Sequence, residues 1–429
     1  MKAKKRACIN KAKLALATGL VACSQLLMTA SAEDITLNWA MWNYSSGPYY
    51  KAIIDAYEAK HPGVNIEYVD LGSTDYNTML LTQLTADADF DVFSVKSVPQ
   101  YSALMNKGNM LKLNDRVAKS DIDTSAYSGL VEEITVNGDL YALPYRSDFW
   151  MVYYNKDLFD KAGVDYPTND MTFEQYDELA AKLSSGFGAN KVYGSLYHTW
   201  RSTVELAGIM DGKHTLADGN YDFLIPSYKR ALKQQKQKIV PSYGFLKTTK
   251  THYSGPFFNG QLAMLPMGSW FIASQIAKVK SGESKAVNWG LVKYPHLKGM
   301  EPGTTASTIT SMAINSKIDK SKQDAAFEFI KFIAGPEGAA IFAKNGTIPA
   351  LRTDAVINSI TAKEGFPSDP ASKEAMVTYK TYLEMPVNPK VGEIELVLNR
   401  AHDAIMTENV SIEEGIKEMN EGVSEVLKR

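Results

Sequence analysis

Apolar positions near the start of the chain recur with two different periods. An alternation of apolar and polar residues, typical of a half-buried strand, runs through 35–42 and 64–68, and a third strand is predicted over 90–95. The segments that follow these strands carry apolar residues three and four apart and predict helices over 50–60, 79–88 and 101–107. Strands that alternate with helices are typical of an α/β fold with a doubly wound sheet, in which ligands bind beyond the carboxyl ends of strands.

The rest of the chain continues with predicted helices and strands of its own. A helix is expected over 221–238, and a buried strand within 258–270 that ends at Trp270. The last helix has a continuous apolar face, so it must pack against another surface. Ser or Thr followed three residues later by an acid or Gln predicts where three helices begin, namely at Thr172 with Gln175, Ser321 with Asp324 and Ser411 with Glu414.

Residues 1–32 are predicted to be a secretory signal rather than part of the fold. Six basic residues and no acid are followed by a mostly apolar run and by Ala30-Ser31-Ala32, a small-residue cleavage pattern. Residues 20–23 offer an alternative, because Leu-Val-Ala-Cys resembles the site at which a lipoprotein is cleaved and acylated, here on Cys23. We therefore expect a periplasmic protein, or alternatively one anchored by lipid to the outer face of the cytoplasmic membrane.

The composition of the mature chain, without the predicted signal, excludes several kinds of chemistry and partner. The two cysteines, Cys8 and Cys23, both lie in it, so the mature chain has no thiol or disulfide chemistry. About 397 residues remain, more than one core usually supports, which predicts two domains. The net charge of these residues is about −8, so neither nucleic acid nor anionic lipid is expected as a partner. We also expect a monomer.

The most informative segment is 143–159, which combines a long apolar strand, a dense set of aromatic rings and the polar side chains Arg146 and Asp148. Aromatic faces together with directional hydrogen-bonding groups suit a sugar. Two alternatives stay open from the sequence. The rings could be core residues of a buried strand, and Asp148 could pair with Arg146 or with a backbone group instead of a ligand.

Patterns that would indicate an enzyme or a metal site are weak. The acids Asp87, Asp89 and Asp91 lie on a helix-to-strand turn, and Glu132 and Glu133 are adjacent, so neither set is a specific glycosidase pair. No nucleophile elbow, zinc-binding helix or phosphate-binding loop is found, and the spacing of the acids does not match an EF-hand. We therefore expect no catalytic residue, no metal and no cofactor.

Three motifs in this order give the chain a family resemblance. They are the segment 143–159 followed by Gly163, the segment 258–270 with Gly268 and Trp270, and the segment 325–332 followed by 335–337 and 346–349. In these motifs the chain resembles the family 1 extracellular solute-binding proteins, the maltodextrin-binding-protein-like sugar receptors of ABC transporters. The resemblance covers essentially the whole mature chain.

The resemblance implies two α/β lobes joined by a multi-strand hinge, with the ligand held between them. Residues 33–144 with 310–346 would form lobe 1, and 149–305 with 350–429 would form lobe 2. The chain would cross between lobes near 145–149, 305–310 and 347–351. A carbohydrate would close the lobes, and the membrane subunits of the transporter would recognise the closed form.

Candidate ligand-binding residues follow from the resemblance and from the strand ends. Asp148 matches the family's carboxylate that accepts sugar hydroxyls, and Trp270 its aromatic platform. Trp39, Trp150 and Trp289 are expected in the core, and His198 and Arg201 could equally cap helices or pair at the surface. The remaining candidates are Trp42, Asn43, Tyr44, Asp75, Lys96, Ser97, Arg146, Tyr197, His198, Trp200 and Arg201.

The identity of the ligand stays open at this point. The many rings favour a carbohydrate, whereas Lys96, Arg146 and Arg201 also allow an acidic sugar, a uronate oligomer or a glycerol phosphate. A secreted glycan-active enzyme, or a ligand-sensing partner of a membrane receptor without transport, is the alternative function.

Overall fold

The first three strands form a parallel sheet whose intervening helices pack beside it. The computed structural model describes residues 34–378 and 380–429. Strand β1 (Ile35–Met41) pairs in parallel with β2 (Val64–Asp70) on one side and with β3 (Val92–Val95) on the other. Helices α1 (Pro48–Lys60), α2 (Tyr76–Thr85) and α3 (Val98–Asn106) follow the three strands, as the alternating pattern predicted.

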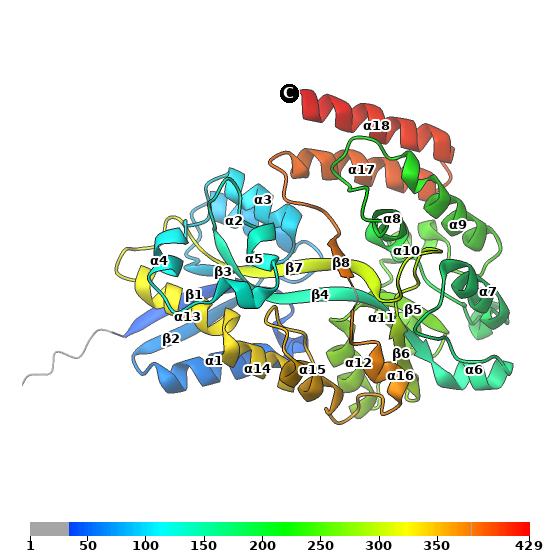
Figure 1. Ribbon diagram of the computed structural model, residues 1–429, viewed down its shortest axis with the longest axis horizontal. Helices are drawn as coiled ribbons and strands as arrows, with labels where there is room; N and C mark the ends of the chain where they lie inside the picture. Colours follow the sequence, from blue (N-terminus) through cyan, green and yellow to red (C-terminus); the bar gives the residue numbers. More distant parts are fainter. Residues whose placement is uncertain (1–33, 379) are drawn as a thin grey trace, which may run out of the picture.

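Two long strands connect this sheet to the rest of the molecule. The amino-terminal half of β4 (Ala142–Asn155) pairs antiparallel with β7 (Thr304–Ile314), and β7 in turn pairs with β3. The carboxyl-terminal half of β4 pairs instead with β5 (Met264–Gly268) and β6 (Trp289–Lys293). Figure 1 shows β4 and β7 running side by side through the middle of the molecule, with helices gathered at both of their ends.

Two separate hydrophobic cores lie at the two ends of these strands. One core takes its residues from 37–145 and 309–351, and the other from 149–306 and 343–426. The segment before residue 351 also lies against β4, because the backbone N–H of Ala350 donates to the carbonyl of Tyr145 at 2.9 Å. The molecule is thus the two-lobe α/β fold that the sequence predicted, and the boundaries given above stay a prediction.

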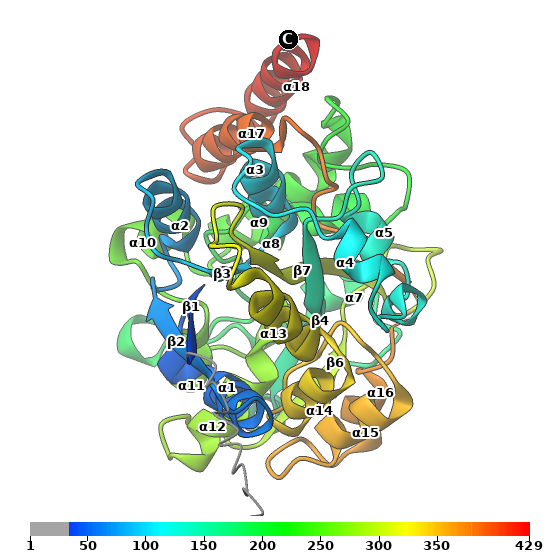
Figure 2. The same cartoon turned by 90° about the vertical axis from the view of Figure 1, so that its left-hand side faces the viewer.

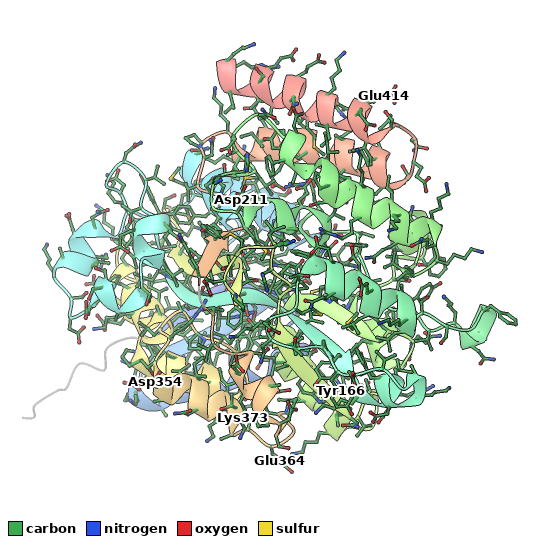
Figure 3. All side chains as sticks on the ribbon, turned by 45° about the vertical axis from the view of Figure 1, so that its right-hand side comes forward. Tyr166, Asp211, Asp354, Glu364, Lys373 and Glu414 are labelled. Carbon is green, nitrogen blue, oxygen red and sulfur yellow. The ribbon has the colours of Figure 1, made fainter. Side chains whose placement is uncertain are left out.

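The carboxyl-terminal helices cover one end of the second core and reach the first. Helix α17 (Val391–Met406) packs against α18 (Ile412–Lys428) and against α3 of the other lobe. Figures 1 and 2 both show α17 beside α3. Figure 3 shows Glu414, at the start of α18, on the outside of the molecule. The apolar face of the last helix is therefore docked, as predicted, on α17 and α9 (Ile225–Lys236).

The remaining helices are α4 (Asn114–Ala118), α5 (Leu130–Glu133), α6 (Lys156–Ala162), α7 (Phe173–Leu183), α8 (Ser202–Ile209), α9 (Ile225–Lys236), α10 (Tyr243–Thr249), α11 (Ser254–Phe258), α12 (Phe271–Lys280), α13 (Gln323–Ala334), α14 (Pro336–Lys344), α15 (Asp354–Thr361) and α16 (Pro370–Glu374). The short strand β8 (Lys380–Leu383) adds in parallel to β7.

Local sequence signals predicted the start of some helices correctly and of one helix wrongly. The capping boxes of Thr172 with Gln175 and of Ser411 with Glu414 both form, so these predictions are confirmed. The predicted cap at Ser321 is wrong, because α13 begins at Gln323 and the preceding Lys322 has no capping side chain. The expected strand within 258–270 is also shorter, since residues 254–258 are the helix α11 and only Met264–Gly268 is extended.

Candidate ligand site at the junction of the two lobes

The centre of the candidate site is an ion pair on β4, where the chain passes between the cores. Nη2 of Arg146 donates to Oδ2 of Asp148 at 2.7 Å, and Nη1 donates to the hydroxyl of Tyr49 at 2.9 Å. The Asp148 carboxylate is 1% exposed and Arg146 is 6% exposed. Burial opposes the charge of the guanidinium, but the Asp148 carboxylate beside it raises the pKa of Arg146 above its usual value.

A second contact ties this pair to the tip of β5. The hydroxyl of Ser269 donates to Oδ1 of Asp148 at 2.8 Å, and the backbone N–H of Ser269 donates to the carbonyl of Phe149 at 2.9 Å. Asp148 therefore holds two hydrogen bonds already. A carboxylate offers about four acceptor positions, so it can still accept from a ligand.

Trp270 follows directly and lies over the backbone of Gly268. A Cβ atom at Gly268 would stand only 2.0 Å from the indole ring, so a side chain there would force the ring away. The indole N–H donates to the hydroxyl of Tyr253 at 3.1 Å, and the ring meets Trp150 edge to face, with centroids 5.7 Å apart. This close approach is the physical reason for the glycine two residues before the tryptophan.

Lobe 1 contributes residues from the carboxyl ends of its strands. Nζ of Lys96, just after β3, donates to the carbonyl and the hydroxyl of Ser73 at 2.8 and 2.9 Å. The same ammonium lies 5.4 Å from the ring centroid of Trp42, which follows β1. Burial, and then the charge of Arg146, lower the pKa of Lys96 to about 8. The carboxyl ends of β1 and β3 thus bring Trp42 and Lys96 together, and the charge of Lys96 is influenced by Arg146 on β4.

Lobe 2 faces them with a group of rings. Tyr253 contacts Trp200, His198 and His252, with ring centroids between 4.0 and 5.6 Å from its own. His198 is 6% exposed, and burial followed by the neighbouring His252 lowers its pKa to about 3. Trp200 is 40% exposed and so forms the rim of the group.

We call this continuous set of side chains the junction cluster. It runs from lobe 1 through the crossing strand into lobe 2, and each member contacts the next or acts on its charge. Its members, in this order, are Trp42, Lys96, Arg146, Asp148, Tyr253, Trp270, Trp200, His198 and His252.

The guanidinium of Arg201 lies outside this cluster, in a buried network inside lobe 2. It donates to the carboxylate of Glu205, to Oε1 of Glu395 at 2.5 Å and to Oδ1 of Asn399 at 3.2 Å. These partners tie α8 to α17, so the donors of Arg201 are engaged by the protein itself. The alternative left open for Arg201 was to cap a helix or to pair at the surface; it does form ion pairs, but they are buried rather than at the surface. Whether Arg201 also contacts ligand stays a prediction.

Several other predicted site residues are also engaged elsewhere. Tyr44 stacks on Tyr68 with ring centroids 3.6 Å apart, and Ser97 caps α3 by accepting from the backbone N–H of Gln100. Asp75 is exposed before α2, and Tyr197 lines a small cavity with Phe173 and Tyr294. The backbone N–H of Asn43, which has a left-handed conformation, donates to Asp70 at 3.0 Å.

Sequence reasoning missed several members of the site. Ser269 stands between the two residues of the glycine–tryptophan motif, so that motif was the available signal. Tyr253 and His252 lie in a segment without a recognisable pattern. Glu384, just after β8, accepts from the indole N–H of Trp150, and burial raises its pKa to about 7.

The tryptophans predicted for the core are buried, and two of the acids considered for catalysis form ion pairs with lysines. Trp39, Trp150 and Trp289 are at most 4% exposed, which confirms the prediction that they belong to the core. Asp87 pairs with Lys317, and Asp91 pairs with Lys322 at 3.0 Å. Within 34–378 and 380–429, no three His, Cys, Asp or Glu side chains are arranged to hold a metal ion, and no helix there is long and apolar enough to span a membrane.

Comparison with known proteins places this chain in a family. The family model described as bacterial extracellular solute-binding protein matches residues 42–340. The chain belongs to that family. A sugar transporter protein from Rhizobium etli, solved in an open conformation, is 58% identical over 91% of this chain and 99% of its own, with a TM-score of 0.78.

More distant relatives share the same architecture. The sn-glycerol-3-phosphate-binding periplasmic protein of Pectobacterium atrosepticum is 23% identical over 383 residues, 82% of this chain and 81% of that protein. An ABC substrate-binding protein from Listeria monocytogenes, solved with cycloalternan, is 21% identical over 92% of this chain and 100% of its own, with a TM-score of 0.79. The latter similarity shows the common fold.

Proposed function

We propose that this solute-binding protein captures a carbohydrate between its two lobes and delivers it to an ABC importer. The observation that carries the proposal is the buried pair of Arg146 and Asp148 on the crossing strand, which contacts Tyr49 of lobe 1 and Ser269 of lobe 2. Ser269 is followed by Trp270, whose ring joins those of Tyr253 and Trp200. Rings supply flat apolar faces for a sugar ring, and the carboxylate accepts hydroxyl hydrogen bonds.

The mechanism follows from the position of the site between two cores. Each lobe carries part of the cluster, so a ligand that contacts both parts binds the closed form better than the open form and shifts the equilibrium between them. The relatives named above, a sugar transporter protein and binding proteins, support transport as the role. The membrane subunits of the importer would then recognise the closed conformation of the two lobes.

A thermal-shift screen of neutral and acidic sugars tests the proposal. A ligand that binds only the folded state adds about 2.7 kcal/mol to the apparent stability at a hundredfold excess over Kd. Chromatography of ligand recovered after long incubation separates binding from catalysis, since we expect the sugar to be returned unchanged. Cleavage products that depend on this chain would support the enzyme alternative.

We also propose that the protein acts outside the cytoplasm after export. The predicted signal, 1–32, lies outside the described residues. Mass analysis of the secreted chain separates the two predicted forms, because cleavage after Ala32 leaves Glu33 first whereas lipoprotein processing leaves an acylated Cys23. Import assays with the membrane subunits of an ABC importer test the partner, and a chain that signals without transport would support the sensor alternative.

A further inference from the structure

The ammonium of Lys96 is a cation whose hydrogen-bond partners are neutral. Its two hydrogen bonds go to the carbonyl and hydroxyl of Ser73. Within the described ranges it forms no ion pair with a carboxylate, and the nearby Asp148 is already paired with Arg146 at 2.7 Å. Burying a charge without a counter-ion is costly, so such a site favours the arrival of an anion.

Lobe 2 contributes two imidazoles, His252 and His198, to the junction cluster. Their ring centroids lie 6.1 Å apart, and the buried Nδ1 of His198 has no hydrogen-bond partner among the described residues. An unpartnered buried ring nitrogen in the junction cluster is a polar group that a ligand can satisfy.

The other charges around the site do not cancel that of Lys96. Arg146 and Asp148 neutralise each other, and Glu384 is bound to the indole N–H of Trp150 on β4. Arg352, near Phe149, donates to the backbone and hydroxyl of Ser147 and adds further positive charge. The Trp42 ring attracts the ammonium, but a cation–π contact contributes only about 0.5–2 kcal/mol.

We infer that the ligand is an anionic carbohydrate whose carboxylate or phosphate group binds the ammonium of Lys96 in lobe 1. The inference rests on the proposed function and specifies its ligand class. The sugar ring would lie on Trp270 and hydrogen-bond to Asp148, while the acidic group would neutralise the ammonium of Lys96. Closure of the lobes would then bring the anionic group of the ligand to Lys96.

Matched pairs of probes test this inference on the full mature chain. D-glucose with D-glucuronate, D-galactose with D-galacturonate, and glycerol with sn-glycerol 3-phosphate differ mainly in one anionic group, and inorganic phosphate alone serves as a fourth probe. We expect calorimetry to find the anionic member of at least one sugar pair bound about tenfold or more tighter than its neutral partner, with an affinity that weakens as salt rises. Preference for uronate or for phosphate identifies the source of the anion.

Variants of Lys96 assign the effect to this side chain. Lys96→Gln should remove most of the preference for the anionic member, and Lys96→Arg should keep much of it. Lys417→Gln, which removes an exposed cation of α18 on the outer surface, should leave the preference unchanged. Unliganded melting of each variant checks that it is folded.

The outcomes separate this inference from the proposed function. If neutral sugars bind as tightly as acidic ones, or if Lys96→Gln leaves the preference intact, the inference is wrong while carbohydrate capture stands. If inorganic phosphate alone binds at Lys96 as tightly as any sugar, the carbohydrate part of the inference is wrong. If no carbohydrate of either charge binds, the proposed function fails, and the inference fails with it.

Discussion

Two buried arginines in this protein make similar ion pairs in very different places. Arg146 pairs with Asp148 on the strand that passes between the lobes, and Arg201 pairs with Glu205 and Glu395 between two helices of one lobe. Both guanidinium groups are at most 8% exposed. The chemistry is alike, but only the first pair faces both lobes. Position relative to the lobe junction, rather than residue type, therefore decides which arginine belongs to the candidate site.

The largest expected effect is the loss of stability that follows when the ion pair of Arg201 with Glu205 inside lobe 2 is broken. Arg201→Met leaves the buried carboxylate of Glu205 without its cation, and we expect the free energy of unfolding to fall by about 3–5 kcal/mol. Intrinsic ligand affinity should be unchanged. Urea denaturation measures the loss.

Arg400→Met is the matched control, because this arginine is 69% exposed in its bridge to Glu418 and its removal should cost no more than about 1 kcal/mol. A stable Arg201→Met variant with weakened binding would instead return Arg201 to the ligand site.

The next effect combines stability and binding at the junction. Asp148→Asn keeps the shape but leaves the Arg146 guanidinium without a charged partner, so unliganded stability should fall by about 1–3 kcal/mol. Affinity should fall at least tenfold, or about 1.4 kcal/mol, because an acceptor for sugar hydroxyls is lost.

Ser269→Ala is the companion variant, since it removes one hydrogen bond to Asp148 and leaves the charge in place. Calorimetric titration together with unliganded melting separates the two contributions. Unchanged affinity in Asp148→Asn would limit the pair to a structural role, like that of Arg201.

A binding effect without a comparable stability effect is expected at Trp270. Trp270→Ala removes a large partly exposed ring over Gly268 and should weaken binding by roughly 1–3 kcal/mol. Trp289→Ala is the core control, because that ring is 4% exposed and its loss should lower stability without changing intrinsic affinity. If Trp270→Ala melts far below the wild type and binds normally when folded, its ring is part of the core.

The last expected effect is a pH dependence carried by Glu384. Burial raises its pKa in the folded protein from 4.5 to about 7, so the folded state binds the proton more tightly than the unfolded state. The free energy of unfolding should therefore decrease as pH rises through this interval. Glu384→Gln removes this contribution.

The measurement is the difference between wild type and Glu384→Gln in thermal melting at about pH 5 and about pH 7.5. His198 contributes with the opposite sign, because its pKa in the folded state is lowered to about 3, but it is present in both proteins and cancels. Parallel melting curves at both pH values would contradict the assignment to Glu384.

Several parts of this molecule were predictable because their signals are local. The capping boxes at Thr172 and Ser411 form from residues three positions apart, and the alternation in 35–42 indicates which side chains enter the sheet. Gly268 before Trp270 was likewise readable as a motif, since the ring packs on the backbone two residues away. Such features depend on spacing along the chain.

The pairing of Arg201, and the contacts of the residues that the sequence did not nominate, depended on partners far away in sequence. Arg201 was nominated from a local cluster of polar and aromatic residues, but its acceptor Glu395 lies 194 positions further on. Tyr253 and Glu384 enter the site only because the chain returns to the junction beside β4. No pattern around either residue indicates that return.

The sequence by itself determined the family, the two-lobe α/β class and the crossing strand that carries Asp148. These features are expressed in apolar periodicity and in the spacing of motifs, which can be recognised along the chain itself. Only the tertiary structure decided which charges are paired. It joins Arg146 to Asp148 and Arg201 to Glu205 and Glu395, and it leaves Lys96 beside neutral groups. The physical reason is that the free energy of a buried charge depends on the distance to its counter-ion, and folding sets that distance.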